Sequence, residues 1–202
     1  MKNFLFALML LPFVPAFGQS DSAYIASIEE HRAKYKQDFL NNEHSPLGEE
    51  DLPYLDFYAP NPDYAVTAEL TLTPDAEPFD LATYSGITKP YVQYGWLDFS
   101  LLGREYRMAV YQSLRLRQMP MYRDYLFLPF KDHTNGDATY GGGRYIDLSI
   151  QDFTEGRITV DFNKAYNPYC AFSDGYNCPI PPSENHLELA IEAGEKAFKG
   201  EH

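Results

Sequence analysis

Basic residues are scarce in this chain of 202 residues. Lys and Arg together number 16 against 29 Asp and Glu, which gives a formal net charge of −13. Nucleic-acid binding is driven by Lys and Arg neutralising phosphates, so this shortage argues against nucleic acid as a partner and also disfavours docking on anionic lipid. The acidity itself either keeps the protein soluble or serves the binding of a cation or a basic partner.

Long hydrophobic runs are also missing. The N-terminal run, residues 4–14, has roughly 11 residues, too few to cross a hydrocarbon core of about 30 Å as a helix. Lys2 precedes this run, and the small residues Ala16 and Gly18 follow it. This order is typical of a secretory signal peptide, with a membrane anchor as the alternative. We therefore expect residues 1–18 to be removed, leaving a periplasmic or secreted chain that does not span a membrane.

Cysteine is limited to two residues, Cys170 and Cys178. In an exported chain an even number of cysteines predicts a disulfide. The alternatives are a zinc site and a catalytic thiol, but the 5 histidines form no familiar ligand pattern with these cysteines. We predict a disulfide, no metal and no other cofactor. The proline-rich loop around the bridge is then either a closure of the fold or the wall of a pocket.

Helical periodicity is confined to the start of the chain, where Ser20–Asn42 carries apolar residues at spacings of three and four. The remainder alternates with a period of two, and its many aromatic and turn residues favour β structure. We predict a mainly β fold, an antiparallel barrel or sandwich of eight or nine strands with an N-terminal helix. Residues 19–48 form the helix and a linker, and residues 49–202 form a single β-rich domain. The expected strands are Leu55–Pro60, Tyr64–Pro74, Phe79–Gly86, two within Tyr91–Ser113, Asp124–Phe130, Gly142–Ile150, Arg157–Phe162 and Leu187–Ala193.

Motifs of common hydrolases and metalloenzymes are missing. The chain has no GxSxG elbow, no HExxH helix and no GxxxxGK[ST] phosphate loop. Three carboxylates, Asp132, Asp161 and Glu184, are the candidates for acid–base catalysis. Arg144 either pairs with a carboxylate inside the fold or clamps an anionic group of a substrate. His133 is interpreted as a turn residue, because it has no nucleophile motif as a partner.

A specific combination of short motifs occupies the C-terminal part of the chain. "DATYGGGRYIDL" is followed by "VDFNKAYNPYCAFSDGYNCPIPPSENHLELAIEAGEK". The second segment holds an FN-basic-AYNP-x-C stretch, a cysteine before P-x-PP, and then EN and AGE. These motifs resemble the C-terminal signature of the bacterial domain-of-unknown-function family 1684, strongly over residues 130–196.

The resemblance implies no reaction, since the family has no established activity, substrate or catalytic residue. Its motifs draw attention to polar residues that could anchor a ligand. Lys164 and His186 stand where larger members often place Arg, and neither can replace a bidentate guanidinium. The ligand-binding candidates are Tyr140, Arg144, Asn163, Tyr166, Asn167 and Asn185.

Three functions remain open. The first is a module whose cavity, walled by the disulfide loop, binds a small molecule through aromatic contacts and a few polar anchors. The second is a hydrolase of cell-envelope or dietary material that uses the acid–base candidates. The third is a structural or interaction protein without a pocket. A cavity favours the first, carboxylates that converge in a cleft favour the second, and mutually paired polar residues without a concavity favour the third.

Overall fold

The structure is a computed structural model that describes residues 17–200, with side chains from residue 21 onward. The predicted signal peptide, residues 1–18, therefore lies almost wholly outside the described residues. One α-helix, α1 (Phe17–Asn41), precedes a sheet of seven antiparallel strands. In the part of the chain that is described, no helix is long and apolar enough to cross a membrane.

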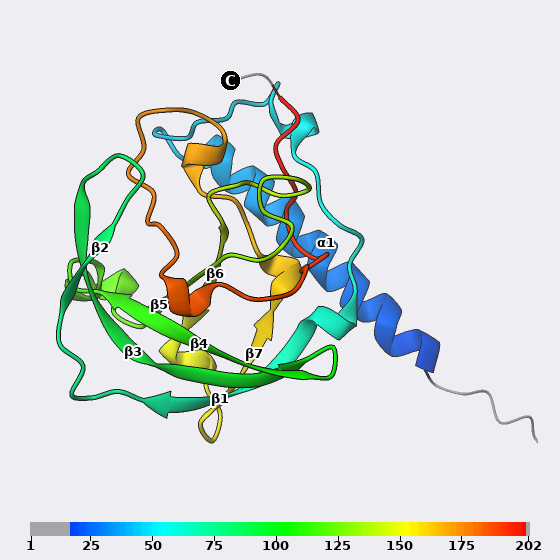
Figure 1. Cartoon of the computed structure of the whole chain (residues 1–202). Helices are drawn as coiled ribbons and strands as arrows, with labels where there is room; N and C mark the ends of the chain where they lie inside the picture. Colours follow the sequence, from blue (N-terminus) through cyan, green and yellow to red (C-terminus); the bar gives the residue numbers. More distant parts are fainter. Residues whose placement is uncertain (1–16, 201–202) are drawn as a thin grey trace, which may run out of the picture.

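The sheet curls into a half-barrel (Figure 1). Its strand order is β6-β5-β4-β3-β1-β7, and β2 pairs with the start of β3 beside β1. The strands are β1 (Ala65–Leu72), β2 (Phe79–Ala82), β3 (Thr88–Leu101), β4 (Arg104–Ser113), β5 (Tyr125–Phe130), β6 (Arg144–Ser149) and β7 (Arg157–Asp161). Short 3₁₀ turns lie before, between and after the strands: η1 (Leu52–Tyr54), η2 (Pro62–Tyr64), η3 (Leu116–Gln118), η4 (Pro120–Tyr122), η5 (Ile150–Asp152), η6 (Phe162–Lys164), η7 (Tyr169–Ala171) and η8 (Ser183–Asn185).

The prediction of a mainly β fold with an N-terminal helix is confirmed, but the count of eight or nine strands is wrong. Residues 55–60 contribute only an isolated bridge between Phe57 and Glu195, and residues 187–193 form no strand. In the latter segment, side chains still alternate between buried and exposed. Its backbone groups, however, bond to two side chains: Arg144 donates to Ile191 O, and Ile191 N donates to Asp132. The alternation of apolar and polar residues in this segment therefore reflects which side chains are buried. It does not indicate pairing with a neighbouring strand.

Period-two alternation gives the sheet two different faces. Along β6, Ile146 and Leu148 join the main core, whereas Tyr145 and Asp147 point to the other face. The main core collects apolar side chains from β3, β4, β5, β6 and β7 together with the C-terminal loops. On the other face a smaller cluster forms around Tyr91, Tyr111, Phe127 and Tyr145.

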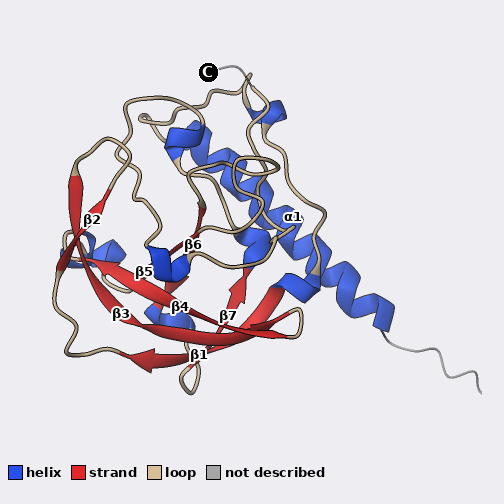
Figure 2. Cartoon of the chain, viewed as in Figure 1, coloured by secondary structure: helices blue, strands red, loops and turns tan. Residues whose placement is uncertain are grey.

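The open side of the half-barrel lies between β6 and β7, and irregular chain fills it. Tyr145 of β6 and Tyr166, which follows β7, exchange two backbone hydrogen bonds of 2.9 and 3.0 Å. Helix α1 packs on this segment and runs from the loop-rich upper part of the view, where it ends, to the lower right, where it begins (Figure 2). A third apolar cluster joins Phe39 of α1 to Ala171 and Phe172 of the cysteine loop. Helix α1 therefore packs against both the segment after β7 and the cysteine loop.

Candidate functional site

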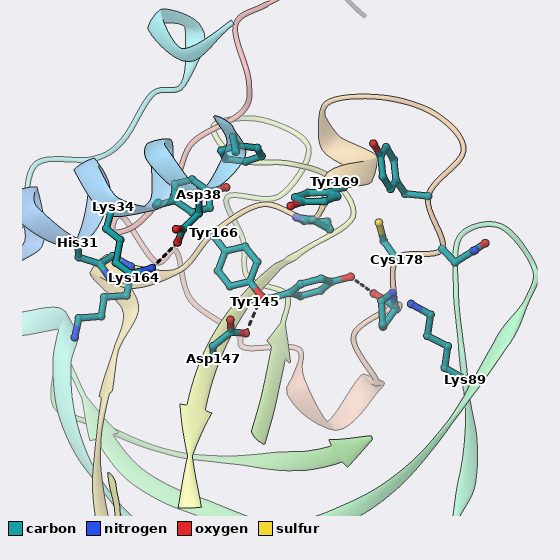
Figure 3. A pocket seen from close by; sticks show the side chains of 16 residues that line it. His31, Lys34, Asp38, Lys89, Tyr145, Asp147, Lys164, Tyr166, Tyr169 and Cys178 are labelled. Atoms are coloured by element: carbon teal, nitrogen blue, oxygen red, sulfur yellow. Dashed lines mark hydrogen bonds and ion pairs between the residues drawn. The ribbon is translucent and has the colours of Figure 1, made fainter. Parts of the chain in front are cut away.

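A cavity of about 590 Å³ lies between α1, β6 and the cysteine loop (Figure 3). It opens on the face of β6 that carries Tyr145 and Asp147. Segments far apart in the sequence supply its walls, since the lining residues run from α1 to the loop that follows Cys170. They are His31, Lys34, Tyr35, Asp38, Phe39, Lys89, Tyr145, Asp147, Lys164, Tyr166, Pro168, Tyr169, Tyr176, Asn177, Cys178 and Pro179.

One wall is the loop closed by the disulfide between Cys170 and Cys178, which confirms the predicted bridge. The loop is also attached to the edge of β2. Tyr84 N donates to Cys178 O at 3.1 Å, and Ile180 N donates to Ala82 O at 2.9 Å. Covalent closure and edge pairing together fix this wall, because neither end of the loop can swing away from the sheet.

Two carboxylates line the cavity, Asp38 of α1 and Asp147 of β6, and Asp147 is the one on the sheet. The hydroxyls of Tyr125 and Tyr166 both donate to its Oδ1, each at 2.7 Å. The side chain is exposed to the solvent that fills the cavity. The protein that forms the cavity walls still desolvates it, which raises the pKa of Asp147, and the two tyrosine hydrogen bonds oppose the rise only in part. Among the described residues Asp147 has no cationic partner, and both of these hydrogen bonds reach only its Oδ1.

Aromatic rings form most of the apolar surface of the cavity. Tyr145 and Tyr166 pack edge to face, with ring centroids 5.9 Å apart, and Tyr35 packs on Tyr166 at 6.0 Å. Tyr145 is fixed further by its hydroxyl, which donates to Pro179 O of the disulfide loop. Burial raises the pKa of both Tyr145 and Tyr166, so both rings present neutral phenols at neutral pH. These rings are held rigidly and can pack against a planar or apolar molecule.

Lysines stand at both sides of the cavity. Lys34 is neutralised by Asp38, one helical turn away, at 2.6 Å. Lys89 and Lys164 form no ion pair within the described residues. Burial, followed by the charge of Lys164, lowers the pKa of His31, which keeps its imidazole neutral near pH 7. The uncompensated charges that face the cavity are therefore those of Lys89, Lys164 and Asp147.

Arg144 and Asp132 lie deep in the interior, and both side chains are fully shielded from solvent. Arg144 Nη2 donates to Asp132 Oδ2 at 2.8 Å, and its guanidinium also reaches carbonyls of the C-terminal segment, Ile191 O and Glu195 O among them. Of the two alternatives given for Arg144, the structure shows the pairing with a carboxylate inside the fold. Neither residue lines the cavity.

Asp161 and Glu184, the other acid–base candidates, lie apart from Asp132. Asp161 accepts from the Tyr24 hydroxyl at 2.9 Å and begins η6, while Glu184 is exposed and accepts from the Tyr111 hydroxyl at 2.8 Å. No hydrogen bond or ion pair of the described residues joins any two of these three carboxylates.

Of the predicted ligand-binding residues, Tyr166 lines the cavity. Three asparagines instead satisfy backbone groups: Asn163 bonds to Asn61, Asn167 to Lys196, and Asn185 to Ala109 and Pro129. Tyr140 is half-buried against the cluster that joins α1 to the disulfide loop. Ligand binding by any of these residues, Tyr166 included, stays a prediction.

Sequence reasoning missed Lys89, Tyr145 and Asp147 as cavity residues. In the sequence, Asp147 is the polar member of an alternating strand, which is typical of a solvent-facing residue. Aromatic neighbours on the same face of the sheet, such as Phe127, would have indicated that Asp147 faces a cavity. Phe127 is recognised as a neighbour, however, only once the register Phe127–Asp147 is known. Within the described side chains, no group of three or more His, Cys, Asp or Glu is placed to hold a metal.

Comparisons with known proteins give a family and a structural relative. A family model described as "Protein of unknown function (DUF1684)" matches residues 50–196. The solution NMR structure of an uncharacterized protein of Haloarcula marismortui is similar to this chain, with 33% sequence identity and a TM-score of 0.67, and the match covers 88% of this chain and 96% of that one. No protein of curated function matches the chain.

Proposed function

Because the chain belongs to the DUF1684 family, whose description carries no activity, we propose on the geometry of the site that the protein binds a small organic molecule in the cavity beside β6. The ligand has a planar or apolar body and an N–H or O–H donor. The observation that carries the proposal is Asp147, an acceptor without a cationic partner among the described residues, which two tyrosines hold in an aromatic cavity.

The size and lining of the cavity support binding of a small molecule. Its volume of about 590 Å³ falls within the range of about 300–1,000 Å³ that is usual for ligand pockets. Such pockets combine mostly apolar and aromatic walls with few polar groups that orient the ligand. Here the tyrosines supply the walls, and Asp147 supplies the orienting acceptor.

The hydroxyls of Tyr125 and Tyr166 hold the orientation of Asp147. Because both donate to Oδ1, the carboxylate cannot rotate freely, and Oδ2 keeps one direction. A donor of the ligand that meets Oδ2 forms a charge-assisted hydrogen bond, which is stronger than a neutral one. The ligand is therefore bound by its ring and oriented by its donor.

The positions of the predicted acid–base residues favour binding over hydrolysis. Asp132 is paired with Arg144, and Asp161 is bonded to Tyr24 and to the start of η6. Glu184 is an exposed residue of the η8 turn, outside the cavity. The cavity itself also counts against a purely structural protein, for which we expected no concavity.

A fragment screen by NMR tests the proposal. We expect ring-bearing fragments with an N–H or O–H donor to shift amide signals of Tyr145, Asp147 and Tyr166 in the ¹⁵N-labelled protein. Asp147→Asn should weaken these fragments by about 10-fold or more, since a hydrogen bond to a charged group contributes about 1.5–3 kcal/mol. Asp80→Asn, an exposed carboxylate on β2, is the matched control. Fragments that scatter over the surface, or that bind Asp147→Asn and the unaltered protein equally, contradict the proposal.

A further inference from the structure

Lys89 and Arg115 carry an inference that rests on the proposed function and narrows its ligand. We propose that these two cations form an anion subsite at the β3 end of the cavity, so that the ligand carries a carboxylate or another anionic group besides its ring. The donor of the ligand then meets Asp147, and its anionic group meets Lys89.

The pairing of β3 with β4 brings the two cations together. The register runs as far as Tyr91 opposite Ser113, and one step further Leu114 N donates to Pro90 O at 3.0 Å. Lys89 and Arg115 are the next residues on either side of this pair, although Arg115 already turns into η3 and does not continue the strand. Two positive residues therefore lie near each other, Lys89 in the cavity wall and exposed Arg115 outside the lining.

No acidic side chain neutralises this pair within the described residues. The ion pairs of the protein use other basic residues, and neither Lys89 nor Arg115 occurs among them. Like charges that lie near each other repel. Burial, followed by the charge of Arg115, lowers the pKa of Lys89, which agrees with a half-buried ammonium next to a second cation. In a chain with a net charge of −13, an uncompensated cation pair at a cavity is a place for an external anion.

The ammonium of Lys89 reaches the cavity from the side opposite α1 (Figure 3). In this view the ring of Tyr145 lies between it and Asp147. Among the described residues no ion pair joins Lys89 to Asp147. A ligand can therefore place a ring on Tyr145 while its anionic group and its donor point in opposite directions.

Three aromatic probes of nearly equal shape test the subsite: 4-hydroxyphenylacetate, its neutral amide 4-hydroxyphenylacetamide, and the cationic amine tyramine. Dissociation constants are measured by NMR titration of the full protein at low salt. We expect the acetate to bind about 10-fold or more tightly than the amide, since a charge-assisted hydrogen bond is about twice as strong as a neutral one. We expect tyramine to bind no better than the amide at this end of the cavity.

Variants then assign the preference to residues. Lys89→Gln should reduce the affinity for the acetate to that for the amide, and Arg115→Gln should reduce it in part. Lys199→Gln is the control, because Lys199 is an exposed lysine that pairs with Asp56 away from the cavity. The preference for the acetate should also shrink on going from low to moderate salt, as expected for an anion held by partly exposed charges.

The outcomes separate the two proposals. If the amide or tyramine binds as tightly as the acetate and shifts the same cavity signals, the anion subsite is overturned and the cavity proposal stands. The anion subsite is likewise overturned if Lys89→Gln keeps the preference for the acetate. If no probe shifts the signals of the cavity at millimolar concentration, both proposals are contradicted.

Discussion

Buried polar residues hold the irregular C-terminal segment in place. Backbone groups that lie away from water must be paired, and a loop has no strand ladder to pair them. Arg144 meets this need: its guanidinium pairs with Asp132 and donates to the carbonyls of Ile191, Ala193 and Glu195. The centroid of the Phe130 ring lies 5.3 Å from the guanidinium carbon of Arg144. The buried guanidinium of Arg144 therefore bonds backbone carbonyls that a neighbouring strand would bond in a sheet.

Glu195 is a second internal polar residue, with no exposed surface. Its Oε2 accepts from the Tyr35 hydroxyl at 2.9 Å and from Asn167 N at 2.7 Å, whereas Oε1 has no partner among the described residues. Burial raises the pKa of Glu195 to about 8, against the weaker opposing effects of these hydrogen bonds and of Arg144. The group is therefore mostly protonated at neutral pH.

The raised pKa of Glu195 predicts a falling stability with rising pH. Between the ordinary value of 4.5 and about 8, the folded protein keeps a proton that the unfolded chain releases. Folded stability should then decrease across this window by up to about 1.4 kcal/mol per pH unit and level off above it. Glu195→Gln should remove this part of the pH dependence, as measured by denaturant unfolding of both proteins from about pH 5 to about pH 8.5.

The control for this test is Glu184→Gln, which changes an exposed carboxylate of the same chain length. It measures what a change of Glu to Gln at the surface does by itself, and the curve for Glu195→Gln is compared with it. Parallel curves for the two variants would show that Glu195 titrates normally.

The disulfide loop acts as an element of the cavity. It connects η7 to the edge of β2 and presents residues from Tyr176 to Pro179 to the cavity. Pro179 also accepts the Tyr145 hydroxyl, which links the loop to β6. One short element thus sets the position of a wall and the orientation of a ring on the sheet.

Removing the bridge should loosen both the fold and the cavity. The Cys170→Ser, Cys178→Ser double variant loses a closed loop of roughly nine residues, and the chain-entropy estimate gives a loss of about 2.5 kcal/mol in the free energy of unfolding. Amide hydrogen exchange at residues 176–179 should increase at the same time. Reducing agent should reproduce both effects in the unaltered protein and leave the double variant unchanged. Equal stability of oxidised and reduced protein contradicts this prediction.

The molecule as a whole combines an incomplete barrel with a large negative charge. Helix α1 and the loops cover the sheet where the strands leave it open, so many of the long-range contacts join regular to irregular structure. The chain carries 29 acidic against 16 basic residues. Its exposed ion pairs, such as Arg157–Glu69 at 2.7 Å, offset only part of this excess.

Self-repulsion of the net charge predicts that salt stabilises the protein. Raising NaCl from about 20 mM to about 300 mM shortens the screening length well below 10 Å and weakens repulsion between exposed carboxylates. We expect the melting temperature in calorimetry at pH 7 to rise across this range. KCl should have the same effect as NaCl if screening is the cause. A melting temperature that falls would show that the surface ion pairs outweigh the net repulsion.

Local patterns determined much of the architecture. The helix predicted over Ser20–Asn42 is found as Phe17–Asn41, and the two long strands predicted within Tyr91–Ser113 are found as β3 and β4. Side-chain periodicity is enough for such elements, because each buries one face along its own length. The disulfide is confirmed for a similar reason, since two cysteines in one chain have only each other as partners within it.

Tertiary structure alone decided the site. Leu187–Ala193 has the alternating residues of a strand, but its backbone forms hydrogen bonds with the side chains of Arg144 and Asp132. No local sequence pattern predicts these long-range bonds. The cavity depends on the register that sets Asp147 beside Phe127 and on the packing of α1 against the disulfide loop. A strand or a bridge follows from the chemistry of nearby residues, whereas a cavity is a volume between distant segments, and its position follows only from how those segments pack.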